Sequence, residues 1–149
     1  MLESVRRIIL IVLSCFTINN SEIPLMYIDI PKIGVYEEIY DKTSSNNDID
    51  KHVIIMKESS YPGENNDVII GAHSGSGPLA YFKDLDKLEI GDQITIDYKN
   101  NKYLYIVNNI HKDDKNGSIK IRENNGLTLF TCYPGDKDNY LIISAYLQV

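Results

Sequence analysis

Residues 127–147 read LTLFTCYPGDKDNYLIISAYL, two apolar runs separated by a polar turn. Alternate residues of a strand point to opposite faces of a sheet, so each run can be divided into two faces. In the first run Leu127 and Leu129 are expected to face inward. Cys132, with Thr128 and Phe130, then faces the other way. In the second run the face expected to join the core consists of Leu141, Ile143, Ala145, Leu147 and Val149. The stretch predicts two strands, and the cysteine that ends the first is not an obvious core residue.

Similar short runs occur along the chain from residue 24 onward. Six of them precede the two above, and all are rich in Ile, Val, Leu and Tyr: LMYIDIP, VYEEIY, KHVIIM, DVIIGA, QITIDY and KYLYIVNNI. Turn-forming residues separate them, which is typical of strands. The sequence therefore predicts an all-β fold of eight strands, closed into a barrel because closure removes exposed strand edges.

Helical patterns are scarce. One is the short NNDIDK stretch at residues 46–51. The other is PLAYFKDLDKL at residues 78–88, in which Leu79, Phe82, Leu85 and Leu88 recur at three-residue spacing. We expect one or two short helices there.

Length and charge limit the classes of function. A chain of 149 residues that is 43% hydrophobic has room for one domain with a core. The 21 acidic side chains outnumber the 15 basic ones, so the formal charge is −6. Nothing would neutralise the phosphates of DNA or RNA, and a nucleic-acid partner is excluded.

The N-terminus has the pattern of an export segment. Arg6 and Arg7 precede an apolar run at residues 8–18, which is shorter than the roughly 20 residues of a spanning helix. No clean A-x-A-like cleavage site follows. We predict an uncleaved signal-anchor at residues 1–20, with the domain of residues 21–149 outside the cell. A buried N-terminal helix is the alternative.

Cys132 is a candidate nucleophile if a base or a cation lies beside it, because the thiolate is the reactive form. His73 directly follows an apolar strand and precedes a glycine-rich loop, where a side chain can be held while a substrate approaches. His52, which opens a strand, and His111, in a polar loop, are expected to face solvent. No local spacing indicates a metal site, no P-loop is complete, and no cofactor is predicted.

The chain resembles the sortases, cysteine transpeptidases of Gram-positive cell surfaces, from about residue 26 to the C-terminus. Four segments carry the resemblance in order: IDIPKIGV, VIIGAHSGSG, YFKDLDKLEIGDQITI and LTLFTC. The TCYP motif at the cysteine is most similar to class D. The resemblance implies a closed eight-stranded barrel in which Cys132 ends the seventh strand and His73 follows the fourth.

The resemblance also implies a mechanism and partners. Cys132 attacks the Thr-Gly bond of an LPXTG-like sorting signal of a surface protein and forms a thioacyl intermediate. His73 acts as general acid and base, and Thr131 helps to line the site. The acceptor is an amine, either of a peptidoglycan precursor or of a pilin lysine. The implied location is the cell membrane, on its extracellular face, where the enzyme anchors proteins to the cell wall.

One position departs from the family. The resemblance implies an arginine near the start of the last strand as a donor to the substrate and the oxyanion, but this chain has Asn139 and Tyr140 there. Tyr140 is the expected equivalent, because its side chain lies on the face opposite the core residues. Arg122, in the preceding loop, is the alternative source of a cation. Two further functions stay open: a sortase-like protein that binds sorting signals without turnover, and a cysteine hydrolase in which water replaces the amine.

Overall fold

The computed structural model describes residues 21–120 and 124–149. The predicted signal-anchor and Arg122 lie outside these residues. The described chain forms eight strands and two short 3-10 helices: β1 (Met26–Ile30), η1 (Pro31–Ile33), β2 (Val35–Ile39), β3 (Ile54–Ile55), β4 (Val68–Gly71), η2 (Leu85–Lys87), β5 (Gln93–Tyr98), β6 (Asn101–Asp114), β7 (Gly126–Cys132) and β8 (Asn139–Leu147). No helix among them is long and apolar enough to cross a membrane.

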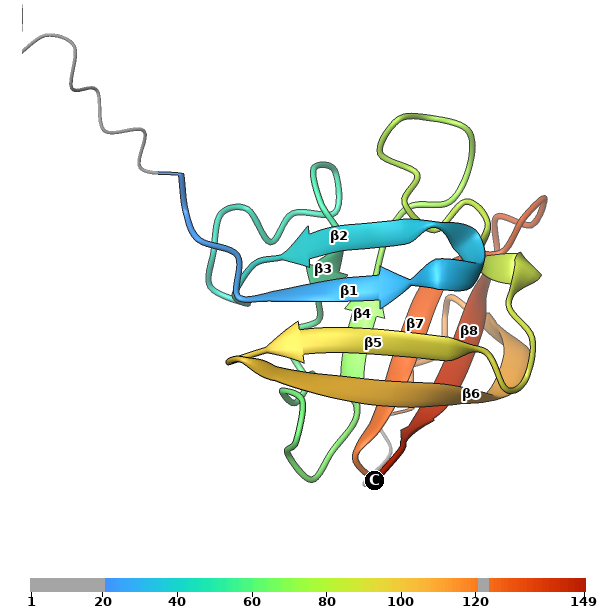
Figure 1. Cartoon of the computed structure of the whole chain (residues 1–149). Coiled ribbons are helices and arrows are strands. Elements are labelled where there is room, and N and C mark those ends of the chain that lie inside the picture. The colour runs from blue at the N-terminus through green and yellow to red at the C-terminus, as the bar shows by residue number, and fades with distance from the viewer. Residues whose placement is uncertain (1–20, 121–123) are drawn as a thin grey trace, which may run out of the picture.

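All eight strands belong to one sheet that curls into a nearly closed barrel. The strand order is β2-β1-β5-β6-β8-β7-β4-β3. A single parallel bridge between Ile39, at the end of β2, and Val53, just before β3, links the two outer strands. In Figure 1, β4, β7 and β8 run behind the layer formed by β1, β2, β5 and β6. The prediction of an all-β, eight-stranded barrel is confirmed.

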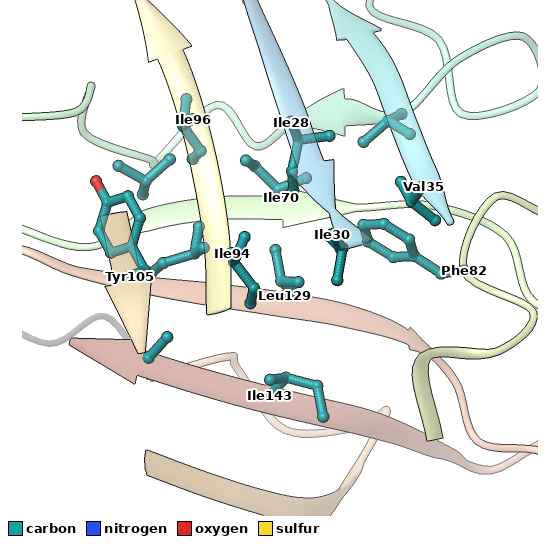
Figure 2. Close-up of a cluster of buried hydrophobic side chains, with 14 of the residues drawn as sticks. Ile28, Ile30, Val35, Ile70, Phe82, Ile94, Ile96, Tyr105, Leu129 and Ile143 are labelled. Carbon is teal, nitrogen blue, oxygen red and sulfur yellow. The ribbon is translucent and has the colours of Figure 1, made fainter. Parts of the chain in front are cut away.

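The core fills the space between these two layers. Isoleucines of β1 and β5 face residues of β4, β7 and β8, such as Ile70, Leu129 and Ile143, all 0% exposed (Figure 2). The burial of β5 alternates strictly, as expected for a strand with one face on the core. Leu127, Leu141 and Ala145 are also buried as predicted. Val149 is fully exposed, contrary to the prediction, because β8 ends at Leu147 and the last residues have no facing sheet.

The outer face of the β4–β7–β8 region is also covered. Ile69, Phe130 and Ile142 form a second buried cluster there, against which Met56, Ile119 and Tyr140 pack. Phe130 therefore points away from the barrel core, as alternation predicts, yet it is only 7% exposed. This part of the sheet is buried on both faces, and the chain beyond β3 and beyond β6 supplies the outer cover.

The helical predictions are confirmed in part. Residues 46–51 form no helix; the Lys51 and His52 amides donate to the Asp48 carbonyl in a single turn. Residues 78–88 contain η2, and Phe82, Leu85 and Leu88 are buried there, whereas Leu79 is exposed. Three-residue spacing matches the period of a 3-10 helix, which accounts for the short element.

Candidate active site

Two predicted residues lie at the ends of neighbouring strands: His73 follows β4, and Cys132 is the last residue of β7. β4 and β7 pair in parallel, with Gly71 opposite Phe130, and each predicted residue lies two positions beyond that pair. The Ala72 amide donates to the Phe130 carbonyl at 3.4 Å, and the Thr131 hydroxyl donates to the Ala72 carbonyl at 2.7 Å. These bonds continue the strand pairing, so the histidine and the cysteine emerge at the same edge of the sheet.

Gly71 leaves room for the Phe130 ring to lie over the end of β4. A Cβ atom at Gly71 would lie 2.3 Å from Cζ of Phe130, much closer than two carbon atoms can approach. The ring in turn meets Tyr140 edge-on, with 5.7 Å between the ring centroids. A glycine at the end of β4 is therefore required by the packing beside the site.

His73 is held by contacts on both its side chain and its backbone. Its Nε2 lies 2.8 Å from Oδ1 of Asp50, and its carbonyl accepts a hydrogen bond from the Phe82 amide at 3.0 Å. The His73 side chain is 42% exposed and that of Asp50 is 81% exposed. The ring is therefore oriented yet open to a substrate. Sequence reasoning missed Asp50, because it lies in the stretch interpreted as a short helix.

Cys132 is partly buried and lies opposite Tyr140 in the antiparallel pairing of β7 and β8. The side chains of such a pair share one face of the sheet. Lys115, just after β6, places Nζ 3.2 Å from Sγ of Cys132 and 5.1 Å from the centroid of the Tyr140 ring. Lys115 was not predicted either: it lies in a polar turn with several charged residues, and no spacing marks it out.

The remaining predicted residues have different surroundings. Thr131 is 2% exposed and lies opposite Leu141 of β8. Its hydroxyl links β7 to Ala72, just after β4, and its role in lining the site stays a prediction. The Asn139 side chain donates to Asp136 at 3.0 Å, and its carbonyl accepts from the Tyr133 amide at 2.9 Å. Asn139 thus closes the turn between β7 and β8.

This turn is further held by Lys112, which pairs with Asp136. The hydrogen bond from Lys112 is the main reason that the pKa of Asp136 lies below its ordinary value of 3.8. The pair connects β6 to the turn that follows Cys132.

The two other histidines lie elsewhere. His52 is half-buried, contrary to the prediction that it faces solvent, because its ring packs on Tyr40 with 4.9 Å between centroids. His111 is exposed as predicted, but it belongs to β6, opposite Ile142, and not to a loop. The strand extends further than its polar sequence indicated because β8 supplies a pairing partner as far as Asp114.

A pocket of about 400 Å³ opens beside the cysteine. Its lining includes Lys115 and Tyr140, two neighbours of Cys132. Apolar side chains also line the pocket, from Met56, Ile69 and Ile119, and Glu58 adds one carboxylate. No group of three or more His, Cys, Asp or Glu side chains that could hold a metal ion occurs in the described part of the chain. The arrangement offers a thiol, a half-exposed imidazole and a mixed apolar and polar pocket, which suits covalent catalysis on an acyl group.

Comparison of the sequence with known protein families identifies one match. The sortase-domain family model matches residues 28–148. Sortase D of Bacillus subtilis (strain 168) is 32% identical over 110 residues, which cover 72% of this chain and 53% of that protein. The chain thus spans about half the length of this relative.

Solved structures share the fold. A sortase C from Clostridium perfringens SM101 is 30% identical, with a TM-score of 0.69, over 86% of this chain and 71% of that one. A sortase D5 transpeptidase of Clostridium perfringens is 24% identical, with a TM-score of 0.73, over 85% of this chain and 79% of that one. The likeness extends over nearly all of the barrel.

Proposed function

Because the chain belongs to the sortase family, and its sequence is similar to a sortase D, we propose that it is a cysteine transpeptidase with Cys132 as nucleophile and His73 as general acid and base. The observation that carries the proposal is the parallel pairing of β4 and β7, in which both residues lie two positions beyond the Gly71–Phe130 pair. An LPXTG-like sorting signal of a surface protein is the proposed substrate.

The first half-reaction transfers the acyl group to sulfur. The Cys132 thiolate attacks the carbonyl carbon of the Thr-Gly bond, a C–S bond forms, and the carbonyl electron pair moves onto oxygen. When this intermediate collapses, the C–N bond breaks and protonated His73 gives its proton to the departing amine. Asp50, 2.8 Å from Nε2, keeps the ring oriented during this step.

The second half-reaction passes the acyl group to an amine. The incoming amine, from a peptidoglycan precursor or a pilin lysine, attacks the thioester carbonyl and loses a proton to His73. The C–S bond breaks and the sulfur leaves as a thiolate, which restores the enzyme. The pocket that includes Lys115 and Tyr140 is lined by both apolar and polar side chains, and we assign it to the side chains of the sorting signal.

The test is incubation with a set of LPXTG-like peptides, followed by mass spectrometry for a thioacyl adduct. We expect an adduct on Cys132 and, with an added amine, a transpeptidation product; hydrolysis alone would indicate water as the acceptor. Cys132→Ala should abolish the adduct and keep the fold. His73→Ala should slow turnover by about 10² to 10⁴, the usual contribution of acid–base catalysis.

His52→Ala and His111→Ala are the matched controls and should remain active, because neither side chain is placed at the ends of β4 and β7. Loss of turnover in either control, with His73→Ala unaffected, would refute the assignment of the base.

We further propose that residues 1–20 anchor the enzyme in the cell membrane, with the domain of residues 21–149 on the extracellular face. Arg6, Arg7 and the apolar run that follows support this placement. The full-length chain should then fractionate with membranes, and a chain that lacks residues 1–20 should be recovered in the soluble fraction. Recovery of the full-length chain from the cytosol would contradict the anchor.

A further inference from the structure

Lys115 is the positively charged group in contact with the candidate nucleophile. Its Nζ lies 3.2 Å from Sγ of Cys132, within hydrogen-bond reach for sulfur. Its backbone amide donates to the Asp138 carbonyl at 3.0 Å, which ties the residue to the turn that follows the cysteine. The ammonium also lies over the Tyr140 ring, and a ring face attracts a cation. The backbone contact to Asp138 and the ring contact of the ammonium together direct the side chain toward the sulfur.

The Lys115 ammonium is not neutralised by an ion pair with a nearby carboxylate. Among the residues that the structure describes, Asp136 pairs with Lys112, and no ion pair joins Lys115 to a carboxylate. Lys112 and Lys115 both approach an aromatic ring next to the site, but Lys112 lies over Tyr133 and is already paired. Only Lys115 combines a contact with Sγ and a place in the wall of the 400 Å³ pocket.

We propose that Lys115 is a catalytic residue that supplies the positive charge of this active site. The inference rests on the proposed transpeptidase function and deepens it. The strand position where the family resemblance implies an arginine holds Tyr140, whose hydroxyl carries no positive charge. In this chain the charge comes instead from the end of β6, and the Tyr140 ring serves as its platform.

Lys115 acts at two moments of the first half-reaction without transferring a proton. Before attack, its ammonium donates to the ionised sulfur, which favours the nucleophilic form. As the C–S bond forms, negative charge leaves the sulfur and develops on the carbonyl oxygen. The ammonium then donates to this oxygen and stabilises the negative charge that develops on it.

The experiment separates these two roles in the full chain in detergent. The variants are Lys115→Met and Lys115→Gln, which remove the charge, and Lys115→Arg, which keeps it. Lys102→Met is the matched control: it removes a lysine from the opposite end of β6, where the side chain pairs with Asp97 at 3.0 Å. The first readout is the rate of Cys132 alkylation by iodoacetamide at pH 7, followed by peptide mapping so that Cys15 does not contribute. The second is the rate of acylation by a sorting peptide.

We expect Cys132 to be alkylated about tenfold more slowly in both neutral variants, because this is the effect of removing one unit charge at this distance when the interaction is screened as in water. Acylation should fall by about 10² to 10³, the usual cost of losing an oxyanion donor. Lys115→Arg should retain most of both rates, and Lys102→Met should match the wild type.

Wild-type alkylation rates in both neutral variants would overturn the inference, whatever their acylation rates. Equal losses in Lys115→Arg and Lys115→Met would do so too, because the charge would then not be the cause. If the wild type forms no adduct with any peptide while the neutral variants still alkylate slowly, the transpeptidase proposal fails and the contact between Lys115 and the thiolate stands.

Discussion

Replacement of Gly71 by alanine tests whether the packing of the Phe130 ring on Gly71 supports the positions of His73 and Cys132. The new Cβ would lie 2.3, 2.6 and 2.8 Å from three atoms of the Phe130 ring, whereas carbon atoms in contact are normally about 3.5 to 4.0 Å apart. The ring must therefore move by more than about 1 Å. It cannot do so freely, because Ile69 and Ile142 bury it and Tyr140 lies against its edge.

Overpacking of this kind costs about 1 to 3 kcal/mol. For a domain of this size, 1 kcal/mol lowers Tm by about 4 °C, so Gly71→Ala should lower Tm by about 4 to 12 °C. Because the displaced ring adjoins Tyr140, alkylation of Cys132 should also slow. Phe130→Leu in the same chain should relieve the clash, so the double variant should be more stable than the sum of the two single effects indicates.

Thermal unfolding monitored by circular dichroism measures these differences. Gly77→Ala is the matched control, because a Cβ atom there would meet nothing within 4 Å; its stability should lie within about 0.5 kcal/mol of the wild type. A Gly71→Ala chain as stable as the wild type, or strictly additive effects in the double variant, would refute the argument.

Three further predictions concern the surroundings of His73 and Cys132. Asp50→Asn should slow acylation while leaving Tm nearly unchanged, because the Asp50 side chain is 81% exposed and its hydrogen bond to the histidine orients a reacting group; unchanged acylation rates would show that Asp50 has no such role. Tyr140→Phe removes the hydroxyl, the donor expected at this position, but keeps the ring over which the Lys115 ammonium lies, so it should lower the rate of acylation, as measured by adduct formation; if only Arg122→Ala loses activity, the assignment of Tyr140 is wrong. The depressed pKa of Asp136 contributes stability that is present above pH 3.8 and is lost as the pH falls through the lower folded-state value. Between pH 6 and pH 3, the free energy of unfolding should therefore decrease less steeply with falling pH for Asp136→Asn than for the wild type. The same pH dependence in both chains would contradict the prediction.

The strands and the positions of the thiol and the imidazole at strand ends could be predicted from the sequence. Alternation of apolar and polar residues has a period of two in a strand, so it assigns Leu127 and Leu129 to the core and Cys132 to the other face without knowledge of the fold. The four ordered segments then indicated the sortase family, and the match over residues 28–148 confirms it.

Periodicity was less informative where both faces of a strand are buried. Phe130 and Ile142 point away from the barrel core and yet are covered, because the chain around Met56 and Ile119 packs on the outside of the sheet. The prediction that the polar end of β6 forms a loop was wrong for a related reason. Its residues are exposed but remain hydrogen-bonded to β8, and exposure alone does not separate a strand from a loop.

Only the tertiary structure brings Asp50 next to His73 and Lys115 next to Cys132. Asp50 is 23 residues from His73 in the chain, and Lys115 is 17 residues from Cys132. Each lies in a turn whose path depends on contacts with other elements, such as the hydrogen bond from the Lys115 amide to Asp138. Local patterns of burial determine which segments become strands, because the apolar face must leave water. They do not determine which of several solvent-facing lysines and aspartates approaches a reactive atom, since in the unfolded chain all of them are hydrated alike.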